Sequence, residues 1–268
     1  MEKNNDLSLF PAEEEKTVQP ASVMWNLWHG CTKISPGCDN CYVYRRDAEF
    51  GKDTTKLNKT EAFNIPITCH SKGELRGQYK YPSGTKFFTC FTSDFFHPNA
   101  DVWRNDAWRI IKTRYDCNFF IITKRPERIE ASLPIDWESS YTNVEICCTC
   151  ENQAMADKRL PIFLELPIIN KSIIHEPMLE KINIKPYLKQ YSDEIKSVTV
   201  GGESGENARV CDFNWVLNTY IQCLEYGVSF SFHQTGSKFK KGGRVFDIPR
   251  KLQREQAKKA GLDFTSET

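Results

Sequence analysis

The stretch NFFIITKR, residues 118–125, decides the fold. Its first part is rich in aromatic and β-branched side chains, and two cations follow at once. A run that is apolar at nearly every position is typical of a parallel strand buried on both faces. Similar short runs occupy residues 86–91, 144–149, 170–175, 195–201 and 228–234.

Amphipathic stretches of helical length separate these runs, for example at residues 102–115 and 214–226. Strands that alternate with helices predict an α/β fold, here a partial or complete βα (TIM-like) barrel with parallel strands. The 268 residues, of which 40% are hydrophobic, supply a full core for one such domain. We place the barrel at residues 21–236, between a mobile acidic arm at residues 1–20 and a basic C-terminal extension at residues 237–268.

Charge and hydropathy exclude several classes of protein. The net charge of +1 excludes a chain held to nucleic acid by bulk charge alone. No apolar run approaches about 18 residues, so we expect no membrane partner. The first residues lack the features of a signal peptide, which favours a cytoplasmic location. Residues 237–259 carry nine Lys or Arg against two acidic residues, which suits either nucleic-acid contact or a solvated terminal helix.

Cysteine is the unusual component, with eleven residues. Cytosolic thiols stay reduced, so metal or cluster ligation is the main alternative to disulfides. Cys31, Cys38 and Cys41 follow a C-x6-C-x2-C spacing, and C-x2-C is a common chelating pair. Three thiolates leave one position open on an iron–sulfur cluster or zinc ion, unless His29 or a distant cysteine closes the site. Unligated thiols are the other alternative. The remaining cysteines are expected in the core: Cys69, Cys90, Cys117, Cys147, Cys148, Cys150, Cys211 and Cys223.

Polar residues follow every predicted strand, and in a barrel these strand ends share the rim where active sites are built. They are Ser93, Asp94, Lys124, Glu151, Asn152, His175, Gly201, Gly202, Glu203 and His233. Each has a second interpretation. The glycines suit ligand contact or a tight turn, Lys124 an anion or a solvated face, and the histidines substrate contact or burial. The Ser-Asp and Glu-Asn pairs suit a ribose or amino group, or helix capping.

A family resemblance begins at the cysteines. WNLWHGCTKISPGCDNCY, residues 25–42, resembles the opening of the phage Gp37/Gp68-type, three-Cys-motif family, which is DUF5131-like. The resemblance covers roughly residues 24–250. Its further motifs are SDFFHP (93–98), ITKRPERI (122–129), ENQAMADKR (151–159), HEPMLEKI (175–182), VGGESGENAR (200–209) and FHQTG (232–236).

This family is similar to radical S-adenosylmethionine (SAM) enzymes, and the similarity implies a set of roles. It implies a [4Fe–4S] cluster on the three cysteines, SAM as second cofactor, and reductive SAM cleavage followed by hydrogen abstraction. A nucleobase or nucleic acid is the candidate substrate, and a flavodoxin- or ferredoxin-type protein the reductant. Independently of the resemblance, their places at the strand ends predict catalytic roles for Glu203, His175, His233 and Lys124. Cofactor contacts fall to Ser93, Asp94, Gly201, Gly202, Glu203, Glu151 and Asn152. The alternative is a non-catalytic, metal-stabilised module of phage origin that binds nucleic acid or protein.

Overall fold

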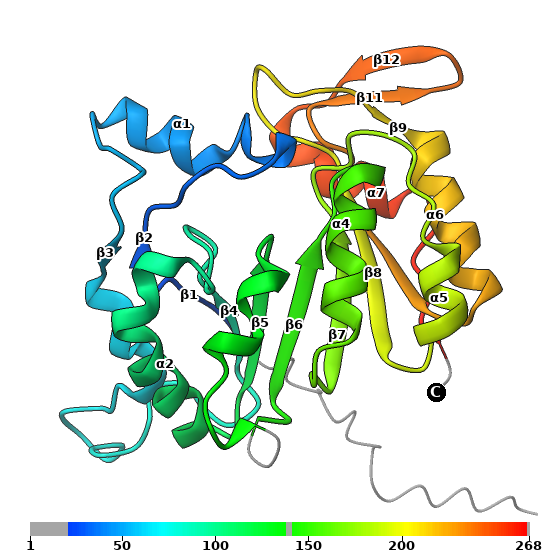
Figure 1. The fold of residues 1–268 in the computed structure, drawn as a ribbon. Helices are drawn as coiled ribbons and strands as arrows, with labels where there is room; N and C mark the ends of the chain where they lie inside the picture. Colours follow the sequence, from blue (N-terminus) through cyan, green and yellow to red (C-terminus); the bar gives the residue numbers. More distant parts are fainter. Residues whose placement is uncertain (1–20, 138–140, 267–268) are drawn as a thin grey trace, which may run out of the picture.

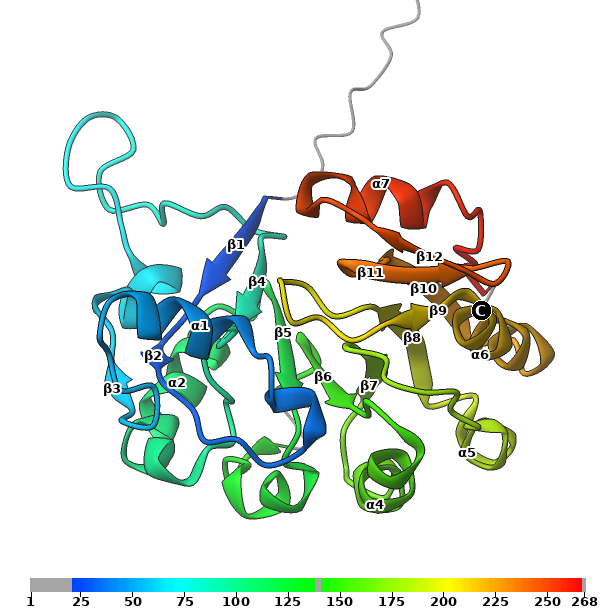
Figure 2. The same ribbon diagram turned by 90° about the horizontal axis from the view of Figure 1, so that it is seen from above.

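The computed structural model describes residues 21–137 and 141–266 (Figure 1). Seven parallel strands form one sheet in the order β1-β4-β5-β6-β7-β8-β10, which follows their order along the chain. The sheet curls into a half-barrel, and within the described residues its edge strands β1 and β10 do not pair (Figure 2). The predicted α/β partial barrel is therefore confirmed. The strands are β1 (Ser22–Trp25), β4 (Lys86–Thr89), β5 (Asn118–Thr123), β6 (Val144–Thr149), β7 (Asn170–His175), β8 (Ile195–Gly201) and β10 (Ser229–Gln234).

Helices cover the outer face of the half-barrel (Figure 2). Alternate strand residues such as Phe119, Ile146 and Val198 point into the core between sheet and helices, where each is almost fully buried. The predicted helices at residues 102–115 and 214–226 match α2 and α6 within two residues. The covering helices are α2 (Asp101–Thr113), α4 (Gln153–Leu164), α5 (Lys185–Tyr191) and α6 (Phe213–Glu225).

The strand predictions fail in two places for local reasons. The strand predicted at residues 86–91 ends at Thr89, because Cys90 adopts a left-handed backbone with φ of 65°. The edge strand β1 was not predicted, since its apolar run is only three residues long and Trp25 alone of its four residues is buried. The arm predicted at residues 1–20 lies outside the described residues.

The predicted C-terminal extension packs against the barrel. Strands β11 (Lys238–Lys241) and β12 (Arg244–Asp247) form a hairpin, and β11 also pairs with β9 (Cys211–Asp212). Helix α7 (Gln253–Lys258) buries Gln253 and Ala257, and Phe264 forms a β-bridge with Phe230. The chain after residue 237 therefore contacts β9 and β10 of the rest of the fold.

The long connection between β1 and β4 passes above the carboxyl ends of the strands with its first helix and then runs back down beside α2 (Figures 1 and 2). It contains β2 (Trp28–His29), the 3-10 turn η1 (Pro36–Cys38), α1 (Tyr42–Glu49), β3 (Asn58–Lys59) and η2 (Glu61–Ile67). Shorter 3-10 turns lie further along the chain at η3 (Pro98–Ala100), η4 (Pro126–Arg128), η5 (Glu130–Ser132) and η6 (Arg250–Leu252). None of the helices in the described part of the chain is long and apolar enough to cross a membrane.

Candidate active site

The three thiols of the cysteine loop, residues 31–41, differ from most other cysteines in their exposure to solvent. Cys31, Cys38 and Cys41 are all partly exposed. The other cysteines are buried as predicted, with one correction: Cys69 is exposed, because it lies in a peripheral loop bridged to Tyr79 rather than in the sheet. The loop therefore presents the thiols that a cofactor on the rim can reach.

Tyr44 lies against the cysteine loop. Its hydroxyl donates to the carbonyl of Cys31 at 2.5 Å. Burial raises the pKa of Tyr44, and the negative charge that each of Cys31, Cys38 and Cys41 carries as a thiolate raises it further. All three sulfurs are thus close enough to one ring to act on it electrostatically.

The first anchor of the loop is an ion pair at the ends of β4 and β5. Asp94 accepts from Arg125 Nη1 at 2.9 Å, and from Thr123 Oγ1 at 2.8 Å. Arg125 reaches on to the loop, where Nη2 donates to the carbonyl of Thr32 at 2.9 Å and Nη1 lies 3.8 Å from Cys31 Sγ. Both charged groups are almost fully buried. Asp94 therefore orients Arg125 and does not face open space.

The charges at this anchor act in opposite directions on the nearest thiol. Burial raises the pKa of Cys31 to about 11, the carboxylate of Asp94 adds to the increase, and Arg125 works against it. Ser93, the neighbour of Asp94, donates its hydroxyl to the carbonyl of Gly30. Ser93 thus fixes the residue that precedes the cysteine loop.

The second anchor is Glu151, at the end of β6. Its side chain is completely buried, and Oε2 pairs with Arg159 Nη1 at 2.7 Å. Oε1 accepts from the backbone amide of Gly37 at 3.0 Å, in the middle of the loop. A Cβ atom at residue 37 would lie 2.9 Å from Glu151 Cδ, so glycine is what allows this approach. The neighbouring Asn152 caps α4 by accepting from Met155, which is the capping interpretation.

The third anchor is Glu203, at the end of β8. Its carboxylate accepts from Arg209 Nη2 at 2.6 Å and from Asn40 Nδ2 at 2.9 Å. Arg209 also donates to the carbonyl of Pro36 at 2.8 Å. Burial opposes ionisation of Glu203, but the hydrogen bonds from Arg209 and Asn40 outweigh it and lower its pKa. Glu203 therefore holds the second half of the cysteine loop.

The two glycines before Glu203 are required by packing between strand ends. A Cβ atom at Gly202 would lie 2.1 Å from the carbonyl oxygen of Thr235, and one at Gly201 would lie 2.5 Å from Glu176 Cδ. Both contacts are shorter than van der Waals distance, so no larger residue fits without displacing a neighbour. This is the tight-turn interpretation of the Gly-Gly pair.

The two histidines lie in different surroundings. His175 has no exposed surface, although the sequence placed it at the mouth. Its Nδ1 donates to the carbonyl of Cys150 at 2.6 Å, Nε2 is buried without a partner, and burial lowers its pKa to about 4. His233 is 38% exposed, and its Nδ1 lies 2.8 Å from Oε2 of Glu176. Only His233 of the two is open to a ligand in this structure.

Lys124 is the remaining predicted site residue. Its backbone amide donates to Asp94 at 3.1 Å, and its side chain is half-buried. Within the described ranges its ammonium group forms no hydrogen bond or ion pair. Lys124 is thus a cation at the rim with capacity for an anionic group.

Several residues that build this site were not assigned from the sequence: Asn40, Arg159, Glu176 and Arg209. All four lie inside the motifs quoted above, at residues 25–42, 151–159, 175–182 and 200–209, so the motifs themselves carried the signal. The sequence alone could not show that Asn40 contacts Glu203 and Asn207, because these residues are about 160 positions apart along the chain.

Fold and site together define a class: a βα half-barrel with a three-cysteine loop fixed across the carboxyl ends of its strands. The sequence matches the family described as protein of unknown function, DUF5131, over residues 15–268. The chain therefore belongs to the DUF5131 family, as its motifs predicted. Neither a curated protein nor a solved structure matches it.

Proposed function

We propose that this protein is a radical-SAM-like enzyme whose Cys31, Cys38 and Cys41 bind a [4Fe–4S] cluster. The observation that carries the proposal is the anchored loop. Three partly exposed thiols lie on one loop that three buried carboxylates fix above the strand ends. The similarity of the family to radical-SAM enzymes supports the same chemistry.

Cysteine thiolates are the ligands that iron–sulfur clusters take. Within the described residues, no group of three or more His, Cys, Asp or Glu side chains is arranged to hold a single metal ion. A cluster binds each cysteine to a different iron atom, so its ligands stay farther apart than those of a zinc ion. His29, the nearby fourth candidate, keeps Nε2 within 2.9 Å of both carboxylate oxygens of Asp47. Three thiols without this histidine leave one iron open.

When bound, the cluster would supply the electron for reductive cleavage of SAM held at the open iron. The chain's own residues prepare the loop for this. Arg125 places a positive charge beside Cys31 and favours its thiolate form. Lys124 and His233 are the predicted catalytic groups that remain open to a ligand; in the described part of the chain His233 Nδ1 contacts Glu176, and Nε2 forms no hydrogen bond.

The substrate we propose is a nucleobase or nucleic acid, with a flavodoxin- or ferredoxin-type protein as electron donor. The β11–β12 hairpin stands above the sheet on the same side as α1 (Figure 1). It carries Lys238, Lys240, Lys241 and Arg244, and of these Lys240 is paired with Asp212 at 3.1 Å. Cations beside the mouth suit a phosphate backbone. The same hairpin favours the second candidate function, a non-catalytic module that binds nucleic acid.

Anaerobic reconstitution tests the cluster. The loaded protein should contain about four irons and four sulfides per chain. Cys31→Ala, Cys38→Ala and Cys41→Ala should each remove them. Cys69→Ala is the matched control, because Cys69 is also an accessible thiol but lies outside the loop. Stoichiometric zinc without sulfide, or equal iron loss in Cys69→Ala, would overturn the cluster.

Calorimetry with SAM separates the enzyme from the binding module. Cluster-loaded protein should bind SAM stoichiometrically, and dithionite should then yield 5′-deoxyadenosine and methionine. His233→Ala should keep SAM cleavage and lose conversion of the true substrate. Absence of SAM binding to fully loaded protein would overturn the radical-SAM assignment and leave the binding module.

A further inference from the structure

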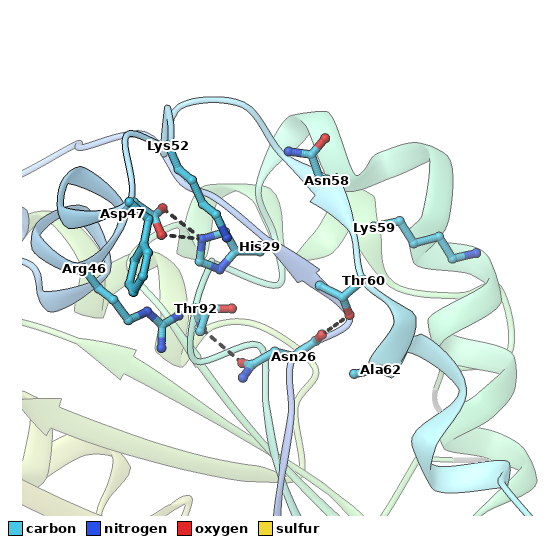
Figure 3. Close-up of a pocket in the computed structure, with 11 residues that line it drawn as sticks. Asn26, His29, Arg46, Asp47, Lys52, Asn58, Lys59, Thr60, Ala62 and Thr92 are labelled. Carbon is cyan, nitrogen blue, oxygen red and sulfur yellow. Dashed lines mark hydrogen bonds and ion pairs between the residues drawn. The ribbon is translucent and has the colours of Figure 1, made fainter.

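A cavity of about 610 Å³ lies beside the cysteine loop and takes no part in the anchors described above. It is bounded by the segments that follow β1 and β4, by α1 and by the chain around β3 (Figure 3). The cavity is connected to the first cysteine. Thr54 accepts from the backbone amide of Cys31 at 2.7 Å and donates its hydroxyl to Asp47, a lining residue, at 2.8 Å. Its volume is that of a site for a small organic ligand.

The charged groups of the lining favour an anion. Arg46, Lys52 and Lys59 line it, and Asp47 is the carboxylate among them. The carboxylate of Asp47 is hydrogen-bonded to His29 and Thr54, and its side chain is almost fully buried. Figure 3 shows Arg46 and Lys52 extending toward the His29 side of the cavity, whereas Lys59 points away from it.

Arg46 and Lys52 are also unpaired. In the described part of the chain neither side chain forms a hydrogen bond or an ion pair, while the ammonium of Lys59 lies 3.8 Å from the centre of the Phe63 ring. Two free cations that face one cavity can both donate to the same phosphate group, and arginine does so with two parallel N–H groups.

The neutral part of the lining suits the rest of a nucleotide. Phe50 borders the cavity and is 71% exposed, which is unusual for a phenylalanine and leaves its ring open for stacking. Aromatic stacking beside cations is how proteins hold single nucleotides of any base. Asn58 and Thr60 also line the cavity; their donors already bond the carbonyls of Lys56 and Asn26, so each offers an acceptor oxygen to sugar or base edges.

We propose that this cavity binds a nucleotide, with its phosphate between Arg46 and Lys52 and its base on Phe50. The phosphate belongs either to a free nucleotide or to a nucleotide within a strand. Binding here needs no cluster. The further step, that this nucleotide is the substrate, rests on the proposed function, because the cavity adjoins the loop that carries Cys31.

The test is calorimetric titration of the full-length protein with thymidine 5′-monophosphate, thymidine, inorganic phosphate and a short oligothymidylate. The monophosphate should bind at least about tenfold more tightly than thymidine. Arg46→Ala and Lys52→Ala should each weaken its binding by about tenfold, a loss of about 1.4 kcal/mol. Phe50→Ala should weaken binding of the monophosphate but not of inorganic phosphate.

Lys72→Ala is the matched control, because Lys72 is exposed but lies outside the lining, and its affinity should equal that of the unaltered protein. Cys38→Ala, which would lack a cluster, should also bind normally; this separates failure of the cavity from failure of the proposed function. A tighter complex with the oligothymidylate, lost in Arg46→Ala, assigns the phosphate to a strand. Equal affinities for thymidine and its monophosphate, or for inorganic phosphate and the monophosphate, would overturn the proposal. So would full affinity in both cation variants.

Discussion

Replacement of Glu151 by alanine should destabilise the protein more than any single surface change. The substitution leaves the guanidinium group of Arg159 buried, with 4% of its side chain exposed and its 2.7 Å partner gone. Breaking a buried pair in this way costs about 3–5 kcal/mol, whereas a domain is stable by about 5–15 kcal/mol. The backbone amide of Gly37 also loses its acceptor, so the cysteine loop should loosen as well.

Urea unfolding measures this cost, and a double-mutant cycle assigns it. Glu151→Leu with Arg159→Met removes both charges, so the double variant should be more stable than either single variant. Lys259→Ala, which removes one partner of an exposed pair with Glu255, is the control and should leave the midpoint unchanged. Additive costs in the cycle, or a Glu151→Ala cost below about 1 kcal/mol, would refute the ion-pair reasoning.

The same carboxylate gives a pH dependence of known sign. Burial opposes ionisation of Glu151, but the charge of Arg159 and the amide of Gly37 outweigh it and lower its pKa below the usual 4.5. A lowered carboxylate pKa stabilises the folded protein above pH 4.5, and this contribution is lost as the pH falls through the folded-state value. The free energy of unfolding, measured by urea unfolding at several pH values, should therefore change less with pH in the acidic range for Glu151→Gln than for the unaltered protein.

Two further predictions concern packing and titration. Gly202→Ala places a Cβ atom 2.1 Å from the carbonyl oxygen of Thr235, and urea unfolding should show a loss of roughly 1–3 kcal/mol; an unchanged midpoint would contradict that contact. His97 and His175 have pKa values near 4, chiefly because burial disfavours their charged forms. Stability should therefore fall as the pH drops from 6.5 toward 4, because the unfolded chain takes up protons that the folded chain does not. NMR titration should show both rings neutral at pH 6, and protonation of either ring there would contradict the burial argument.

The fold could be predicted because a parallel sheet covered by helices imposes a strong pattern. Strand β5 is apolar at Phe119–Ile122, β7 is buried at all but its first residue, and the bounds of both were predicted without error. Where the pattern is weak, prediction failed: β1 is an exposed edge, and the turn at Cys90 depends on a backbone angle that residue type does not encode. The docking of the C-terminal hairpin depends on its pairing with β9, a contact between distant segments.

The structure shows where the predicted site residues lie and which contacts they make. The sequence correctly placed Asp94, Glu151 and Glu203 at strand ends. It could not show that each carboxylate meets an arginine, since such pairing depends on the fold and not on spacing. Because their oxygens already accept protein hydrogen bonds, these three side chains have little capacity left for a ribose or an amino group. A side chain such as Lys124, whose charged group forms no hydrogen bond or ion pair in the described part of the chain, has more capacity for a ligand.

The pairing of each carboxylate with an arginine offsets the negative charge that the carboxylate would otherwise place near the thiols. A carboxylate is a good acceptor for loop amides, but its charge disfavours nearby thiolates, as Asp94 does for Cys31. Each arginine makes its pair neutral, so the loop is anchored at three strand ends without a net negative charge beneath it. Lysine could neutralise the same charges, but it lacks the fork with which Arg125 reaches Asp94 and Thr32 together. The geometry of the loop therefore depends on arginine at these positions, and not on positive charge alone.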